Sequence, residues 1–114
     1  MTQQSGAAPA PDPKEKKVIV TLTENPKTIT VVPETVRLHK FEGHLATWES
    51  PQGQSFEIQF DQADTPFHGH RFDHQTAKKL GVHPNVPNNP QKRYKYTVRV
   101  PGYPDLDPGV IVDP

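Results

Sequence analysis

The sequence predicts an all-β fold, a single β-sandwich of about seven strands. Three observations lead to this prediction. Short runs rich in β-branched and aromatic residues alternate apolar with polar positions. Turn residues separate these runs, and proline contributes 14 of the 114 residues. One segment alone, residues 73–80, favours a helix, and that helix would have about two turns at most.

The first three predicted strands follow one another closely. Residues 18–23 (VIVTLT) are β-branched and alternating, and the sequence ENP then interrupts them. Residues 28–32 (TITVV) form a second strand that ends before Pro33. Residues 35–41 (TVRLHKF) alternate valine and leucine with polar neighbours, which predicts the third strand.

The next two predicted strands carry much of the expected core. Residues 45–50 (LATWES) place Ala46 and Trp48 on one face, and PQGQ then predicts a turn. Residues 55–61 (SFEIQFD) place three large apolar side chains on one face and polar side chains on the other. Such alternation is typical of a strand with one buried and one solvated face. We therefore expect Trp48 and these aromatic residues in the core.

Residues 62–92 are the least regular part of the sequence. A helix near residues 73–80 would begin at Asp73, whose side chain can cap it. The segment also contains four histidines, which are His68, His70, His74 and His83. In an extended chain His68 and His70 share one face, and Asp73 can ligate a metal or orient a ring. Two interpretations remain open, a polar surface loop or a Zn or Cu site built from these histidines.

The last two predicted strands lie near the C-terminus. Residues 93–100 (RYKYTVRV) alternate aromatic or aliphatic residues with polar ones throughout. PGYPDLDPG then predicts a long turn, and turn chemistry explains Asp105 and Asp107. Residues 110–112 (VIV) form the last strand.

The first 17 residues (MTQQSGAAPAPDPKEKK) contain no large apolar side chain after Met1. Such a segment buries too little surface to offset the entropy of ordering it. We predict a disordered N-terminal tail over residues 1–17 and one β-sandwich domain over residues 18–114.

Charge and composition exclude several classes of function. Thirteen basic residues balance thirteen acidic ones, so the chain lacks the basic footprint of a nucleic-acid-binding protein. No apolar run approaches the ~18 residues of a membrane span, and the start lacks a signal-peptide pattern, so we expect a cytoplasmic location. The absence of cysteine excludes disulfides and thiolate metal ligands.

Four stretches resemble the cupredoxin-like β-sandwich, a Greek-key, immunoglobulin-like fold. They are ATWES, SFEIQF, YKYTVRV and DPGVIVDP. The resemblance covers residues 18–114 and is closest to uncharacterised bacterial proteins that keep this framework without its metal. It implies a fold and not electron transfer, because the positions of the copper ligands hold other residues.

The copper ligands of the resembled family have no counterpart here. A type 1 copper site needs two His, a Cys thiolate and usually an axial Met. The resemblance assigns the first His to Phe56 in FEIQF and the Cys to Val98 in YKYTV. The loop before the last strand, PGYPDLDPG, contains neither His nor Met.

We therefore expect a small non-enzymatic binding or interaction module with no cofactor and with a protein or small molecule as its partner. Loops at one end of a sandwich can carry recognition, and residues 62–92 are the longest irregular segment. No phosphate loop, nucleophile elbow or catalytic triad pattern occurs in the sequence. The alternative is a His-rich divalent-metal-binding protein that uses the 68–74 loop to bind Zn or Cu.

Overall fold

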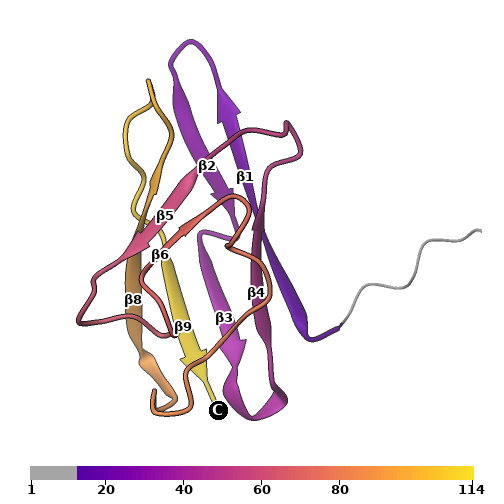
Figure 1. The fold of residues 1–114 in the computed structure, drawn as a ribbon, viewed down its shortest axis with the longest axis vertical. Coiled ribbons are helices and arrows are strands. Elements are labelled where there is room, and N and C mark those ends of the chain that lie inside the picture. The colour runs from indigo at the N-terminus through magenta and orange to yellow at the C-terminus, as the bar shows by residue number, and fades with distance from the viewer. Residues whose placement is uncertain (1–12) are drawn as a thin grey trace, which may run out of the picture.

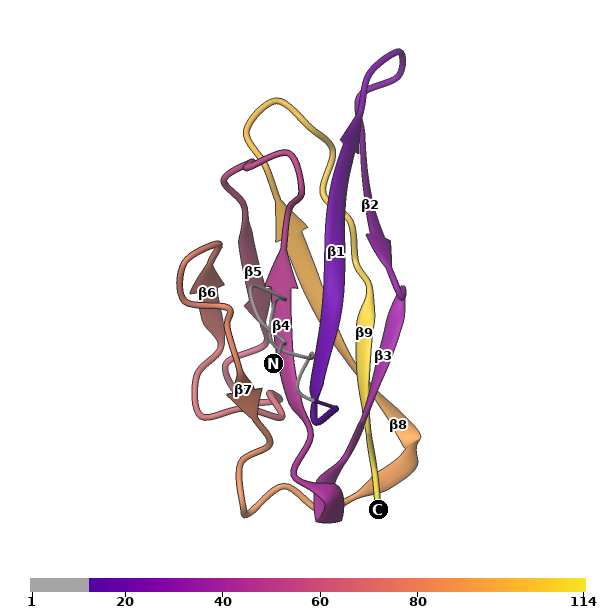
Figure 2. The same cartoon turned by 90° about the vertical axis from the view of Figure 1, so that its right-hand side faces the viewer.

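Two β-sheets face each other in the computed structural model, which describes residues 13–114 (Figure 1). The first sheet has the order β2 (Thr28–Val32), β1 (Glu15–Thr23), β4 (Leu45–Glu49), β7 (Leu80–Gly81). The second has the order β3 (Thr35–His39), β9 (Gly109–Asp113), β8 (Asn89–Arg99), β5 (Glu57–Phe60), β6 (Arg71–Asp73). The predicted all-β sandwich is confirmed: in Figure 1 β1 and β4 of the first sheet lie to the right of β8 and β9 of the second, and Figure 2 shows the two sheets face-on and overlapping.

The strands combine antiparallel hairpins with two parallel pairs. β1 pairs antiparallel with β2, while β8 lies antiparallel to both β5 and β9. The chain then changes sheets at Pro33, so that β3 lies parallel to β9 while β1 lies parallel to β4. All seven predicted strands are present, and the short strands β6 and β7 are additional.

The core lies between the sheets and is rich in aromatic side chains. Trp48 on β4 is completely buried, as the sequence predicts, and its Nε1–H donates a hydrogen bond of 2.9 Å to the Tyr96 hydroxyl on β8. Phe60 and Phe67 pack around this pair, with ring centroids 5.1 Å apart for Phe60 and Tyr96 and 6.1 Å apart for Trp48 and Phe67. Aromatic pairs at such distances add to the stability gained from area burial.

β1 begins at Glu15, before the predicted domain boundary at Val18. The parallel register extends the pairing of β1 with β4 to Glu15 opposite Leu45 and Lys16 opposite Ala46. The Glu15 carboxylate also accepts a hydrogen bond of 2.6 Å from the Thr47 hydroxyl. Of the predicted tail, residues 1–12 lie outside the described residues.

Residues 73–80 do not form the helix that their composition favours. Asp73 does cap a turn, since its side-chain Oδ1 accepts the Thr76 N–H at 3.0 Å, and the Ala77 N–H donates to its backbone carbonyl at 2.9 Å. The Ala77 carbonyl, however, accepts the Trp48 N–H at 2.8 Å, and Lys79 has a positive φ of 50°. Residues after Ala77 therefore pair with β4 instead of continuing a helix, and the chain goes on into β7.

The only helical segment between residues 13 and 114 is the 3₁₀ turn η1 (Lys40–Glu42), which connects β3 to β4. Gly43 ends the turn with a φ of 69°, a conformation that glycine adopts without strain. Among the described residues, no helix has both the length and the apolar character that crossing a membrane requires.

Candidate functional site

The four histidines of the predicted metal site do not converge. The rings of His68 and His83 lie together, with centroids 4.4 Å apart. His74 instead lies against Phe56, at a centroid distance of 6.1 Å. The backbone carbonyl of His70 accepts the Phe60 N–H at 2.6 Å. Within residues 13–114, no group of three or more His, Asp or Glu side chains is arranged to hold a metal ion.

The tautomer of His83 bears on what the His68–His83 pair can bind. The Asn85 N–H donates to His83 Nδ1 at 3.0 Å, so Nδ1 carries the lone pair. A neutral imidazole with an accepting Nδ1 has its proton on Nε2. Nε2 of His83 is therefore a hydrogen-bond donor, and a metal would bind there only after the Asn85 bond had broken.

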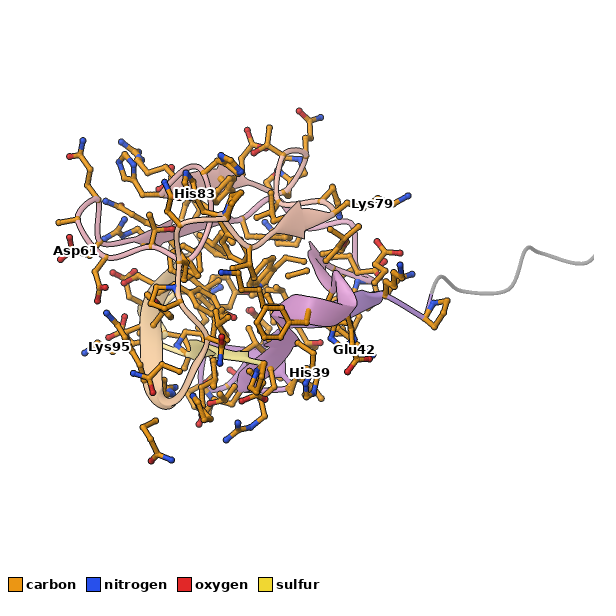
Figure 3. All side chains as sticks on the ribbon, turned by 90° about the horizontal axis from the view of Figure 1, so that it is seen from below. His39, Glu42, Asp61, Lys79, His83 and Lys95 are labelled. Carbon is orange, nitrogen blue, oxygen red and sulfur yellow. The ribbon has the colours of Figure 1, made fainter. Side chains whose placement is uncertain are left out.

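A second histidine pair, which sequence analysis does not single out, lies at the end of β3. His44 is buried, and its Nδ1 accepts the His39 N–H at 3.0 Å. Its Nε2 lies 3.5 Å from a Glu42 carboxylate oxygen. Burial, and then the positive charge of Lys16, lowers the pKa of His44 below its ordinary value. Figure 3 shows His39 and Glu42 together and well apart from His83.

A pocket of about 630 Å³ opens where three segments that are distant in sequence meet. Figure 1 shows the β4–β5 and β8–β9 connections at the same end of the sandwich as the β1–β2 hairpin. The walls come from the start of β5, from the turn after β6, and from the end of β8 with its following loop. The pocket lining includes Phe56, Glu57, Asp73, His74, Arg99, Val100, Tyr103 and Asp105.

The floor of the pocket is apolar. Phe56 and Val100 are each 4 % exposed and both line the cavity. The antiparallel register that pairs Glu57 with Arg99 also brings Phe56 opposite Val100. Val98, which the resemblance assigns to the thiolate position, lies one step deeper and pairs with Ile58. The side chain that shares the pocket with Phe56 is thus Val100.

The rim of the pocket is charged and is cross-linked by Arg99. Its guanidinium lies 3.4 Å from an Asp105 oxygen and 3.8 Å from Glu57 Oε1, and it donates a hydrogen bond to Gln59. Arg71 on β6 holds the other Glu57 oxygen at 3.0 Å. These contacts connect β5, β6, β8 and the β8–β9 loop, which together surround the apolar floor.

Asp73 occupies the rim with one carboxylate oxygen already engaged. Its Oδ1 accepts backbone N–H groups of Gln75 at 2.8 Å and Thr76 at 3.0 Å. These two hydrogen bonds, Gln75 first, hold the pKa of the Asp73 carboxyl below its usual range. The adjacent His74 turns its ring to Phe56 and lines the pocket.

Tyr103 forms a wall that the β1–β2 hairpin braces. Its hydroxyl donates a hydrogen bond to Glu24, which is the main cause that raises the pKa of Tyr103. Lys27 binds Glu24 at 3.1 Å and lies 4.8 Å from the centre of the Tyr103 ring. Gly102, at a φ of 87°, makes the turn that brings Tyr103 there.

Sequence analysis found His74 but missed its partners in the pocket. It interprets Asp105 as turn chemistry and Phe56 as core, and both descriptions hold locally. The sequence feature that could have pointed to the pocket is Tyr103, the aromatic residue between two prolines in PGYPD. A half-buried tyrosine in a turn is well placed for recognition. Comparisons with models of protein families, with curated proteins and with solved structures found no match.

Proposed function

We propose that this protein is a small binding module without catalytic activity, and that it takes its ligand in the pocket between Phe56, His74 and Tyr103. The observation that carries the proposal is the combination of an apolar floor with a charged, cross-linked rim. Pockets that bind small molecules typically span roughly 300–1,000 Å³ and combine an apolar lining with a few polar groups. The cavity of about 630 Å³ lies within that range.

We further propose that the scaffold is cupredoxin-like and that the pocket occupies the place of a metal centre. The support is positional. The resemblance assigns copper ligands to Phe56, Val98 and the loop before the last strand; Phe56 and that loop line the pocket, and Val98 lies one step deeper on β8. Apolar and aromatic side chains at these positions favour an organic ligand over a transition metal.

The partners of the rim carboxylates support binding rather than catalysis. Arg71 and Arg99 neutralise Glu57, and backbone N–H groups engage Asp73. Among the described pocket residues, the Tyr103 hydroxyl is hydrogen-bonded to the Glu24 carboxylate, but Lys27 already binds that carboxylate and the pKa of Tyr103 is raised, whereas an activated nucleophile needs a free base or a lowered pKa. A general acid or base would also need a pKa near the working pH, whereas the pKa of Asp73 is lowered.

A screen of small aromatic and aliphatic compounds by amide NMR tests the proposed function. We expect perturbed signals from residues 55–57, 73–74 and 99–105, and weaker binding in the His74→Ala variant. His68→Ala is the matched control, because His68 lies on the same irregular segment but outside the pocket. If no compound perturbs these signals, or if both variants bind equally well, the pocket is not the functional site.

Binding of a divalent metal remains a second candidate, and the approach of His68 and His83 is the observation that favours it. Titration with Zn(II) and Cu(II), using protein without a histidine tag, separates two outcomes. A single strong site that weakens at least about tenfold in His83→Ala would establish metal binding. We expect a weak isotherm that each single substitution barely changes, because the four histidines do not converge.

A further inference from the structure

We propose that the ligand of this pocket is an amphipathic organic cation, with an amine or guanidinium group on an aromatic or aliphatic body. The inference rests on the proposed function, since it specifies what the same pocket binds. Three features of the pocket carry it, namely the balance of charge on the rim, the unused carboxylate oxygens and the aromatic walls.

The rim carries more negative than positive charge. The side chains of Glu57, Asp73 and Asp105 line the cavity, against one guanidinium, that of Arg99. Arg71 lies outside the lining but binds Glu57 at 3.0 Å, so two guanidinium groups face three carboxylates. A cation is therefore favoured over a neutral or anionic ligand of the same shape.

Two of these carboxylates keep an oxygen for a ligand. Asp105 binds Arg99 through Oδ2, and no hydrogen bond or ion pair among the described residues uses its Oδ1. From the described residues, Asp73 accepts hydrogen bonds through Oδ1 only, which leaves Oδ2 for a ligand. An ammonium group has three donors and no acceptor, so it suits a site that offers acceptors only.

The walls of the pocket suit the rest of such a ligand. Phe56 and Val100 form an apolar floor against which an aliphatic or aromatic body can pack. Tyr103 already holds one cation, Lys27, at 4.8 Å from its ring centre. Aromatic faces attract cations through the ring quadrupole, and the effect strengthens where water is partly excluded.

Three probes of nearly the same shape test the charge preference. They are 2-phenylethylamine, 2-phenylethanol and 3-phenylpropionate, which are cationic, neutral and anionic at neutral pH. In NMR titrations at low salt, we expect the amine to bind about two- to fivefold tighter than the alcohol, and the carboxylate to bind most weakly. About 0.5 M salt should reduce the preference, because it screens exposed charges.

The titrations distinguish failure of this inference from failure of the proposed function. If the alcohol or the carboxylate binds as tightly as the amine and perturbs the same residues, the pocket stands and the cation preference is overturned. If none of the three probes perturbs residues 55–57, 73–74 and 99–105, both the cation preference and the proposed function are contradicted.

A pair of isosteric variants locates the charge that matters. Asp105→Asn should weaken binding of the amine about two- to fivefold and leave binding of the alcohol unchanged. Asp107→Asn is the matched control, since Asp107 lies two residues further along, accepts a hydrogen bond from Thr97 at 2.8 Å and does not line the pocket. Equal loss for amine and alcohol in Asp105→Asn would indicate a purely structural effect and would overturn the inference.

Discussion

At the scale of single residues, the bond between Trp48 and Tyr96 joins the two sheets across the core. Both side chains are almost fully buried, and burial raises the pKa of the Tyr96 hydroxyl. The indole N–H has no access to water in this position, so the tyrosine hydroxyl is its partner. A buried donor without a partner costs more than the bond itself contributes.

Tyr96→Phe should therefore destabilise the fold by about 1–3 kcal/mol, because the Trp48 N–H stays buried without its acceptor. Urea unfolding followed by tryptophan fluorescence measures the change. Tyr94→Phe is the control on the same strand and face, since Tyr94 is also buried but none of the described hydrogen bonds involves its hydroxyl. Equal losses in the two variants would contradict a specific role for the Trp48–Tyr96 bond.

His44 should make the stability depend on pH. Its pKa is lowered in the folded state, mainly by burial, so near pH 6 the unfolded chain binds more protons than the folded one. The contribution is complete above the unfolded pKa of about 6.5 and is lost as pH falls from there through the folded pKa. Denaturant unfolding between pH 8 and pH 5, at intervals of about half a unit, measures this slope.

The variant His44→Asn isolates that contribution. An asparagine oxygen can accept the His39 N–H in place of Nδ1, yet it does not titrate. We expect a shallower fall in stability below about pH 6.5 in this variant. His39, Glu42 and Lys16 surround the ring and remain in both proteins. An unchanged slope in the variant would assign the pH dependence to other groups.

At the scale of elements, the start of β1 shows why polar residues can belong to a strand. Glu15 and Lys17 lack the apolar alternation that identifies strands in a sequence, but their backbone pairs with β4. The Leu45 N–H also donates to the Lys14 carbonyl at 2.7 Å. Removal of residues 1–17 should cost roughly 1–3 kcal/mol, since several hydrogen bonds are lost.

Thermal and urea unfolding of two truncations tests the role of this segment. The control removes residues 1–12, which contain no large apolar side chain after Met1, and should leave the free energy of unfolding nearly unchanged. The longer truncation also removes the hydrogen bond of 2.6 Å between Glu15 and Thr47. If both truncations unfold at the same urea concentration, pairing of residues 15–17 with β4 contributes nothing measurable.

Local patterns predict the long strands well, because apolar alternation reports which face is buried. They do not predict β6 and β7, whose two or three residues are extended only because β5 and β4 lie beside them. The failed helix at residues 73–80 has the same origin. Its capping residue behaves as expected, but the Ala77 carbonyl is taken by Trp48, far away in sequence.

The candidate site was less predictable than the fold for a related reason. His74 carries a visible signal, whereas Val100, Tyr103 and Asp105 become neighbours of Phe56 only when β5 and β8 pair. No local pattern encodes that convergence. A metal site requires several ligating side chains close together, and spacing along a loop did not bring the four histidines into one place.

At the scale of the whole molecule, the two ends of the sandwich differ in chemistry. The end with the β1–β2 hairpin carries the pocket, and its loops are braced by Glu24, Lys27 and Arg99. The other end carries η1 and the His39–His44 pair near the C-terminus (Figure 2). The proposed ligand site and the predicted pH response thus lie at separate places, and substitutions at one end should not disturb the other.

The balance of charge over the whole chain predicts when molecules of this protein attract one another. Thirteen basic and thirteen acidic residues give zero formal net charge at pH 7, with an isoelectric point near 7.0. Repulsion between molecules is therefore weakest near neutral pH. The second virial coefficient from light scattering at low salt should pass through a minimum near pH 7 and rise on either side.

A single exposed residue can move that minimum. Lys95 on β8 points outward in Figure 3, and none of the described ion pairs or hydrogen bonds involves its side chain, so its replacement disturbs no contact. Lys95→Glu makes the net charge more negative by two, and the minimum should shift below pH 7. Lys95→Arg keeps the charge and should keep the minimum in place. A minimum that is the same in both variants would mean that a local patch, and not net charge, governs self-association.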